Sequence, residues 1–163
     1  ILAKLLTYDE LAARAAPVGT AAWELLDIQA GLPSIVAETA DAFVPQMVNF
    51  GLIGGVSFKK GCYTGQEVVA RMQYLGKLKR RMYYAHIAAT EGPRPGTDLY
   101  APGSESGQGT GKLVTAARSP DGGVEALAVV EVAGAEGGEV RLGGPEGPVL
   151  EFRPLPYAVP ADA

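Results

Sequence analysis

The single cysteine of the chain, Cys62, stands in the stretch FKKGCYTGQEVVAR at residues 58–71 and is the first candidate for chemistry. Thr64 followed by Glu67 has the spacing of a helix capping box, which predicts a helix with Thr64 as its N-cap. Cys62 then lies two residues before that cap, near the positive end of the helix dipole, and Lys60 is close in sequence. Both features favour the thiolate, the form in which a cysteine is a nucleophile.

A structural cysteine, used as a small apolar side chain between a strand and a helix, is the alternative to this reactive cysteine. One cysteine and one histidine cannot form an internal disulfide, a Cys/His zinc site or a four-thiolate iron–sulfur site, so no metal site is predicted. The histidine, His86, falls in a predicted strand and is expected to have a structural role. This sparse use of cysteine is typical of the reducing cytoplasm.

The charge of the chain is unevenly distributed. The net charge is −4, but residues 58–81 carry seven cations against one anion, Glu67. Such a basic stretch in an acidic chain indicates an anionic partner, either a carboxylate-bearing ligand or a nucleic acid. A solvated helix end followed by an edge strand would explain the same charges. The seven cations are Lys59, Lys60, Arg71, Lys77, Lys79, Arg80 and Arg81.

The elements before the motif are predicted from caps and breakers. Thr7 and Glu10 form a capping box for a first helix, which Pro17 ends. Thr20 is placed to cap a second helix, AAWELLDIQA, which Gly31 closes. The prolines and glycines of the following 23 residues, 33–55, predict an irregular, largely buried stretch with a short strand near VSF.

The helix that follows Cys62 is predicted to be amphipathic. It begins at Gly65, and Val68, Met72 and Leu75 lie at the i, i+4 and i+7 spacing of one apolar face. Gly76 supplies the C-terminal stop.

The second half of the chain is predicted to be β. Six short segments are separated by Gly/Pro-rich turns: RMYYAHIAA, TDLYA, GKLVTAARS, VEALAVVEV, EVRLG and VLEFR. This spacing is typical of a small sandwich or barrel, and the tail PLPYAVPADA is expected to be extended or disordered. No apolar run reaches the roughly 20 residues of a membrane span. The chain lacks an initiator methionine and opens within an amphipathic pattern, so a fragment or processed chain is expected.

The stretch GGVSFKKGCYTGQEVVAR resembles the signature of the YgfZ family of folate-binding proteins, K-G-C-Y-x-G-Q-E, which are relatives of the glycine-cleavage T-protein. AWELLDIQAGLP resembles the family segment A-W-x-L-x-x-I-x-A-G-I-P, and FVPQMVNFGLIGGVSF resembles F-I-P-Q-x-x-N-L-x-x-L-G-G-I-S-F. The resemblance is close over residues 20–82 and architectural beyond them.

The resemblance implies an α+β fold. Residues 1–76 would be the end of a T-protein-like folate-binding domain, residues 77–155 a small antiparallel β-barrel, and residues 156–163 an extended tail. It implies a folate-dependent (tetrahydrofolate-dependent) accessory role in iron–sulfur cluster assembly or repair. Expected partners are folate and iron–sulfur client proteins or assembly factors, with an indirect link to tRNA through tRNA-modifying enzymes, in the cytoplasm and without a membrane.

The resemblance also assigns the site residues. Cys62 and Lys60 are the candidate catalytic residues, and Trp23 resembles a family tryptophan whose flat indole would stack on a folate ring. The remaining candidate cofactor-binding residues are Gln29, Tyr63, Gly65, Gln66, Glu67 and Arg71.

Two departures from the family pattern bear on function. The family's N-terminal half, which completes the folate cavity, is absent, so this chain alone is expected to bind folate poorly. T-protein relatives often read R-x-E-A-G where this chain has Asp27, Ile28 and Gln29, which weighs against T-protein-type aminomethyl transfer and leaves open whether the protein is an enzyme. A one-carbon (aminomethyl) transferase and a module that docks tRNA or a tRNA enzyme through residues 77–84 remain the alternatives.

Overall fold

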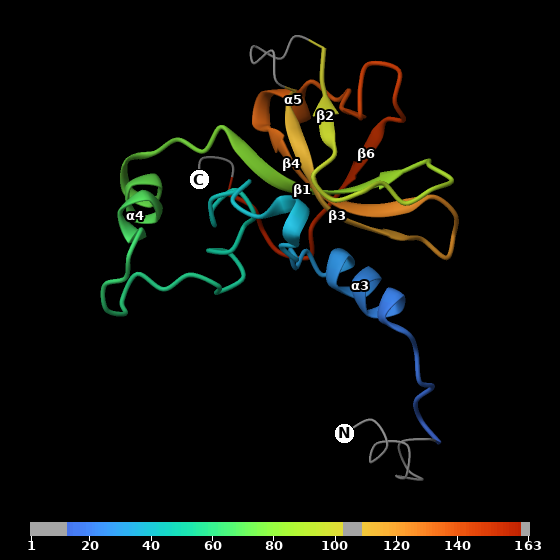
Figure 1. The fold of residues 1–163 in the computed structure, drawn as a ribbon, viewed down its shortest axis with the longest axis horizontal. Helices are drawn as coiled ribbons and strands as arrows, with labels where there is room; N and C mark the ends of the chain where they lie inside the picture. Colours follow the sequence, from blue (N-terminus) through green and yellow to red (C-terminus); the bar gives the residue numbers. More distant parts are fainter. Residues whose placement is uncertain (1–12, 103–108, 161–163) are drawn as a thin grey trace.

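The computed structural model describes residues 13–102 and 109–160, and their fold is α+β, as predicted. A curled antiparallel sheet forms the second half, with one helix close to it and another at the far end of the molecule (Figure 1). Thr7 and Glu10, which predicted the first helix, lie outside the described residues.

All six predicted strands are present, and each pairs antiparallel with its neighbours in the order β5-β2-β3-β4-β1-β6. A bridge between Arg141 and Val149 brings the β5 edge to the segment that leads into β6, so the sheet curls into a partial barrel. The strands are β1 (Arg80–Ile87), β2 (Asp98–Tyr100), β3 (Gly111–Arg118), β4 (Val124–Glu131), β5 (Arg141–Leu142) and β6 (Leu150–Arg153).

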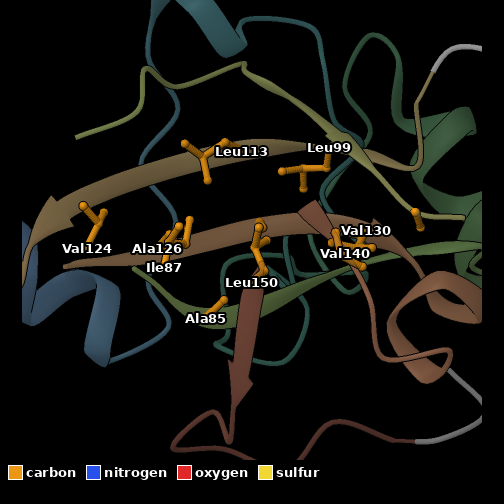
Figure 2. Packing of buried hydrophobic residues seen from close by; sticks show 11 residues of the cluster. Ala85, Ile87, Leu99, Leu113, Val124, Ala126, Val130, Val140 and Leu150 are labelled. Atoms are coloured by element: carbon orange, nitrogen blue, oxygen red, sulfur yellow. The ribbon is translucent and has the colours of Figure 1, made fainter. Parts of the chain in front are cut away.

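The sheet is buried on both faces at its centre. Successive side chains of a strand point to opposite faces, and residues 124–130 of β4 are buried without exception. One face forms the apolar core inside the curl, with Ile87, Leu99 and Leu113 among its members (Figure 2). The other face carries Met82, Val114, Leu127 and Val129, which pack with residues from the first half of the chain.

The predicted second helix is α3 (Thr20–Gln29), and its Ile28 packs on the outer face of the sheet together with Val48. Thr20 is not the cap as predicted, because Gly19 occupies that position in an extended conformation and Thr20 is already helical. Gly31 follows the helix with φ +69°, a left-handed conformation that suits glycine. These contacts join the two predicted domains, residues 1–76 and 77–155. The division of the chain into these two domains stays a prediction.

The stretch between Pro33 and Gly55 is irregular, as predicted, with one short 3₁₀ helix at Ala37–Thr39. Two parts of the prediction were wrong: residues 56–58 form no strand, and only Thr39, Val48 and Asn49 of this stretch are buried. The stretch lies across the surface because only a few of its side chains reach the sheet.

The motif helix is α4 (Gln66–Leu75), and it begins one residue later than predicted. Gly65 is the N-cap with φ +85°, and no side chain caps the helix, so the predicted capping by Thr64 is wrong. The predicted apolar face is wrong at Val68, which is 58% exposed, while its neighbour Val69 is 9% exposed. Gly76 ends the helix as predicted.

The C-terminal segment, residues 154–160, has no regular structure but packs back on the end of α3 and on β1. The Tyr157 hydroxyl donates to the Gly31 carbonyl oxygen at 2.9 Å, and Arg81 Nη1 donates to the Pro160 carbonyl oxygen at 2.6 Å. A five-residue helix, α5 (Val132–Glu136), follows β4 where the sequence predicted a turn. In the described ranges, no helix is long and apolar enough to cross a membrane.

Candidate functional site

The motif cysteine lies at the surface. Cys62 is a free, exposed thiol in the segment that leads into α4. This exposure excludes the apolar core as its environment. The cysteine does not, however, line the groove that its neighbours form.

That groove, of about 310 Å³, lies between the motif segment and α4. Phe58 and Tyr74 form one wall, with ring centroids 5.8 Å apart in an edge-to-face arrangement. The Lys60 ammonium lies 5.8 Å from the centre of the Tyr63 ring, a favourable cation–π distance. We call this hollow the motif groove; its lining residues are Val56, Ser57, Phe58, Lys60, Gly61, Tyr63, Gln66, Glu67, Val69, Ala70 and Tyr74.

Several predicted site residues meet in the motif groove, since Lys60, Tyr63, Gln66 and Glu67 all line it. The Tyr63 amide donates to Gln66 Oε1 at 3.3 Å, which ties the segment to the first turn of α4. Gly65 contributes through its left-handed backbone, which makes the turn between them. The groove therefore combines an aromatic wall, one ammonium and one carboxylate, a surface suited to an amphiphilic ligand with an anionic end.

Three predicted residues lie elsewhere. Arg71 lines a separate hollow of about 320 Å³ with Glu67, Val68, Met72 and Gly76. Trp23 and Gln29 belong to α3 and are exposed, with the indole 66% exposed. Figure 1 shows α3 and α4 well apart, so within the described residues Trp23 does not share a pocket with the motif.

Part of the basic run after α4 is engaged in contacts within the fold. Arg80 forms an ion pair with Glu131 at 3.2 Å. Arg81 is only 6% exposed, and burial lowers the pKa of its guanidinium. Tyr83 packs on Phe152 with ring centroids 5.2 Å apart. Residues 77–84 therefore present fewer groups to a nucleic acid than their sequence indicates.

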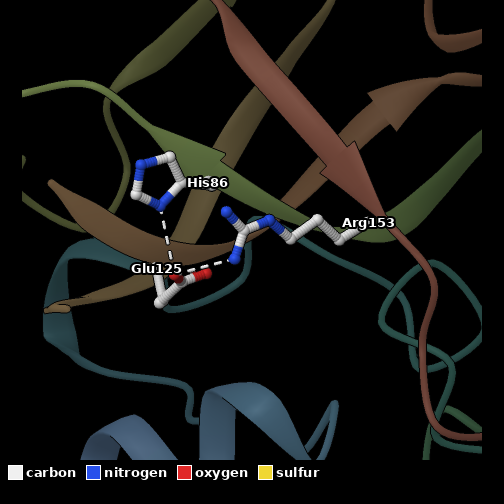
Figure 3. Close-up of polar contacts among 3 residues, drawn as sticks. All are labelled: His86, Glu125 and Arg153. Atoms are coloured by element: carbon white, nitrogen blue, oxygen red, sulfur yellow. Dashed lines mark hydrogen bonds and ion pairs between the residues drawn. The ribbon is translucent and has the colours of Figure 1, made fainter. Parts of the chain in front are cut away.

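The histidine has the structural role that was predicted for it. His86 Nδ1 and Arg153 Nη1 each lie 3.1 Å from Glu125 Oε1, at the sheet (Figure 3). Burial alone would raise the pKa of Glu125, which is 3% exposed, but hydrogen bonds from Tyr84 and His86 and the Arg153 charge outweigh it, so the pKa is lowered. Burial raises the pKa of Tyr84. No group of three His, Cys, Asp or Glu side chains suited to a metal occurs in the described part of the chain.

Sequence reasoning missed two residues that tie the irregular stretch to α4 and to β1. Gln46 Nε2 donates to the Val69 carbonyl oxygen of α4 at 2.6 Å. Asn49 is 2% exposed with φ +59°, and its Nδ2 donates to the Met82 carbonyl oxygen of β1 at 3.0 Å. The sequence signal that could have identified them is a pair of amide side chains, three residues apart, in the otherwise apolar run PQMVN.

Comparison with known proteins finds relatives along nearly the whole chain. It is 38% identical over 154 residues to the tRNA-modifying protein YgfZ of Yersinia enterocolitica, covering 94% of this chain and 47% of that protein. It is 37% identical over 152 residues to the protein of the same name from Cronobacter sakazakii, covering 93% of this chain and 46% of that protein. The protein of the same name from Edwardsiella ictaluri is 37% identical over 151 residues, again covering 93% of this chain and 46% of that protein. No family model matches the chain.

These relatives share one name, tRNA-modifying protein YgfZ, and so belong to the class of tRNA-modifying proteins. The resemblance to the YgfZ family is confirmed, and this chain is homologous to YgfZ proteins over 93–94% of its length. The chain spans about half the length of the curated relatives it matches.

Proposed function

We propose that this chain is part of a folate-dependent accessory protein that assembles or repairs iron–sulfur clusters and thereby supports tRNA-modifying enzymes in the cytoplasm. The observation that carries the proposal is the motif groove, in which Lys60, Tyr63, Gln66 and Glu67 meet beside the exposed Cys62. The name of the relatives supports the link to tRNA modification. In this proposal residues 1–76 are the end of a T-protein-like folate-binding domain.

Folate fits the motif groove in its chemical character, because it joins a flat ring system to glutamate carboxylates. Phe58 and Tyr74 offer aromatic surface, and Lys60, with Lys59 beside it in the chain, offers ammonium groups that would hold a carboxylate. Bound folate would supply one-carbon chemistry. Cys62 would then present a nucleophilic or redox thiol next to the ligand rather than inside the groove.

Trp23 and Gln29 enter the proposal as parts of a larger site. They are exposed on α3, away from the motif groove. An exposed indole is a suitable stacking surface for a ring system that a further part of the longer protein would enclose. We therefore assign the complete folate site to a protein of the relatives' length.

The experiment that tests the lysines is folate binding by a protein of the relatives' length that contains this chain. We expect the double variant Lys59→Ala, Lys60→Ala to bind polyglutamyl folate at least tenfold more weakly. The double variant Lys77→Ala, Lys79→Ala is the matched control, because it removes the same charge outside the motif groove. Equal affinity of the first variant and the unsubstituted protein would overturn the assignment.

A second comparison tests the division of the site. The 163-residue chain is expected to bind folate much more weakly than the longer protein, and Trp23→Ala is expected to weaken binding in the longer protein. Micromolar affinity of the isolated chain would contradict the proposal that the site is completed elsewhere.

A further inference from the structure

Five exposed cations lie on α4 and in the segments that flank it, and Figure 1 shows α4 at the end of the molecule away from the sheet. Glu67 is the one carboxylate between residues 58 and 79. None of the five cations forms an ion pair within the described part of the chain. Two cations of the sheet, Lys112 and Arg141, each contact a carboxylate at 2.6 Å. The five cations around α4 are Lys59, Lys60, Arg71, Lys77 and Lys79.

The fold itself does not explain three of these charges. Arg71 does not lie in the last turn of α4, where a cation would stabilise the helix dipole. Glu67 stands one turn before Arg71, at the spacing of a helical ion pair, but no ion pair joins these two described residues. Lys77 and Lys79 follow the end of the helix at Gly76. Like charges without a counter-charge repel one another, so the group indicates a partner with negative charge.

An exposed aromatic ring lies among these cations. Tyr74 is 71% exposed, although its ring meets Phe58 edge to face with centroids 5.8 Å apart. Residues three apart share a face of a helix, so Tyr74 lies beside Arg71. Lys77 follows Tyr74 by three residues, just beyond the helix end. An acidic partner would need the cations alone, whereas an exposed ring among them adds a surface on which a flat ring can stack.

The surface is hollowed next to Arg71. The hollow measures about 320 Å³, and Val68 and Met72 give it an apolar lining. Gly76 also lines it, which places it next to the backbone that leads to Lys77. Charged and apolar sites thus alternate along the end of α4. A single-stranded nucleic acid has the same alternation, with phosphates between flat bases.

We propose that the end of α4 and the segment after it bind single-stranded RNA. Arg71, Lys77 and Lys79 hold phosphates, and an unpaired base stacks on Tyr74. Proteins that bind single strands combine cations along the backbone with aromatic rings under the bases. RNA offers such unpaired bases in its loops, bulges and ends. We call these four residues the α4 end surface.

The α4 end surface differs from residues 77–84, the docking segment considered from the sequence. Arg80, Arg81 and Tyr83 of that segment are engaged within the fold and take no part. Tyr74 also forms a wall of the motif groove, but the three cations of the α4 end surface lie outside that groove. The inference therefore goes beyond the function proposed for the motif groove.

The first test measures the contribution of the cations. The 163-residue chain is titrated into a labelled, unstructured RNA of about 12 nucleotides at several salt concentrations. The double variant Lys77→Ala, Lys79→Ala should bind about tenfold more weakly. It should also lower the slope of log Kd against log salt by about 1.4, since each phosphate contact of a single strand contributes about 0.7.

The matched control is the double variant Arg94→Ala, Arg118→Ala. It removes two exposed cations outside the α4 end surface and should leave both the affinity and the salt slope close to those of the unsubstituted chain. Equal losses in the two double variants would show that only the total charge matters, and no detectable RNA binding by the unsubstituted chain would equally overturn the proposal.

The second test measures stacking. Tyr74→Ala should weaken RNA binding at least fivefold with an unchanged salt slope, while Tyr74→Phe keeps the ring and should retain the affinity. The same RNA annealed to its complement should bind more weakly, because paired bases cannot stack on Tyr74. Unchanged affinity of Tyr74→Ala, equal binding of the duplex or of an oligoglutamate of the same length, or tighter binding of the matched single-stranded DNA would overturn the proposal.

A last comparison separates this surface from the folate proposal. In a protein of the relatives' length, the double variant Lys77→Ala, Lys79→Ala should lose RNA affinity and retain folate affinity. Loss of RNA binding in the unsubstituted longer protein would show that its further part covers the α4 end surface and would overturn the inference. Folate binding is measured with a different ligand, so failure of the RNA experiments leaves that proposal to its own test.

Discussion

The partial barrel and the motif segment are built in opposite ways. Residues 124–130 of β4 are all buried between two apolar layers. Among the described side chains of α4 and the segment before it, Val69 is the buried hydrophobic residue, while Tyr63, Val68 and Tyr74 are between 48% and 71% exposed. The sheet is thus held by packing on both faces, whereas the motif is held by a few anchors such as the hydrogen bond from Gln46.

This difference separates stability from ligand binding within one short chain. A region with few buried apolar contacts opens at lower free energy than a packed core. Its surfaces remain available, and the motif groove lies there. Substitutions in the sheet should therefore change the free energy of unfolding, and substitutions around α4 should change binding.

The largest expected effect is at the centre of the sheet. Leu127→Ala removes a fully buried side chain that packs with Ile28 of α3, and it should cost about 2–5 kcal/mol of unfolding free energy. Val68→Ala on α4, at 58% exposure, should change stability by less than about 0.5 kcal/mol. Urea unfolding followed by circular dichroism measures both. Similar losses in the two variants would break the comparison.

The next effect concerns the buried carboxylate of the sheet. Glu125→Gln weakens charged hydrogen bonds with His86 and Arg153 and should cost about 1–3 kcal/mol at neutral pH. The pKa of Glu125 is lowered in the folded state. Its contribution is therefore complete above the unfolded-chain value of about 4.3 and is lost as the pH falls through the folded pKa.

Stability measured between about pH 7 and pH 3 checks that sign. The unsubstituted chain should lose more stability on acidification than Glu125→Gln. Glu91→Gln, at an exposed position, is the control and should follow the unsubstituted chain. An acid-stability curve that Glu125→Gln leaves unchanged would contradict the prediction.

A smaller effect is expected where the C-terminal segment meets α3. Tyr157→Phe removes the hydroxyl that donates to the Gly31 carbonyl oxygen and should cost about 1 kcal/mol. Tyr74→Phe, at 71% exposure on α4, should be neutral in the same unfolding experiment. If the two variants lost equal stability, the anchoring role of Tyr157 would be wrong.

The smallest expected effect on stability is at the cysteine. Cys62→Ser should change the unfolding free energy by less than about 0.5 kcal/mol, because the side chain is exposed. The unsubstituted thiol should react with iodoacetamide in the folded protein. Labelling that appears only after unfolding would show that Cys62 is protected and would remove this contrast with the sheet.

The sequence predicted the strands well because their signals are local. Alternating and continuous apolar runs between Gly/Pro turns located all six strands. The sequence did not predict α5. Gly134 of this helix packs so closely on Thr110 that a Cβ there would lie 2.8 Å from Thr110 Oγ1, and a tertiary contact of this kind is not visible in the sequence. The helix caps were misplaced because Gly19 and Gly65, rather than the neighbouring threonines, adopt the cap conformations.

The candidate site was predictable only where it is contiguous in sequence. Lys60, Tyr63, Gln66 and Glu67 are close along the chain, and they meet in one groove. The contacts of Gln46 and Asn49 span 23 and 33 residues, and no local pattern encodes them. The separation of Trp23 from this groove is likewise set by the packing of α3 on the sheet.

The anchoring of the C-terminal segment has a consequence for biosynthesis. Tyr157 and Gly31 are 126 residues apart, and Arg81 and Pro160 are 79 residues apart. A ribosome delivers the chain from its N-terminus at about 5–20 residues per second, so α3 emerges many seconds before the tyrosine that secures its end. Residues that leave the ribosome late thus secure a helix of this chain that left it early, and a translation stop shortly before Tyr157 would release a chain in which the end of α3 lacks this hydrogen bond.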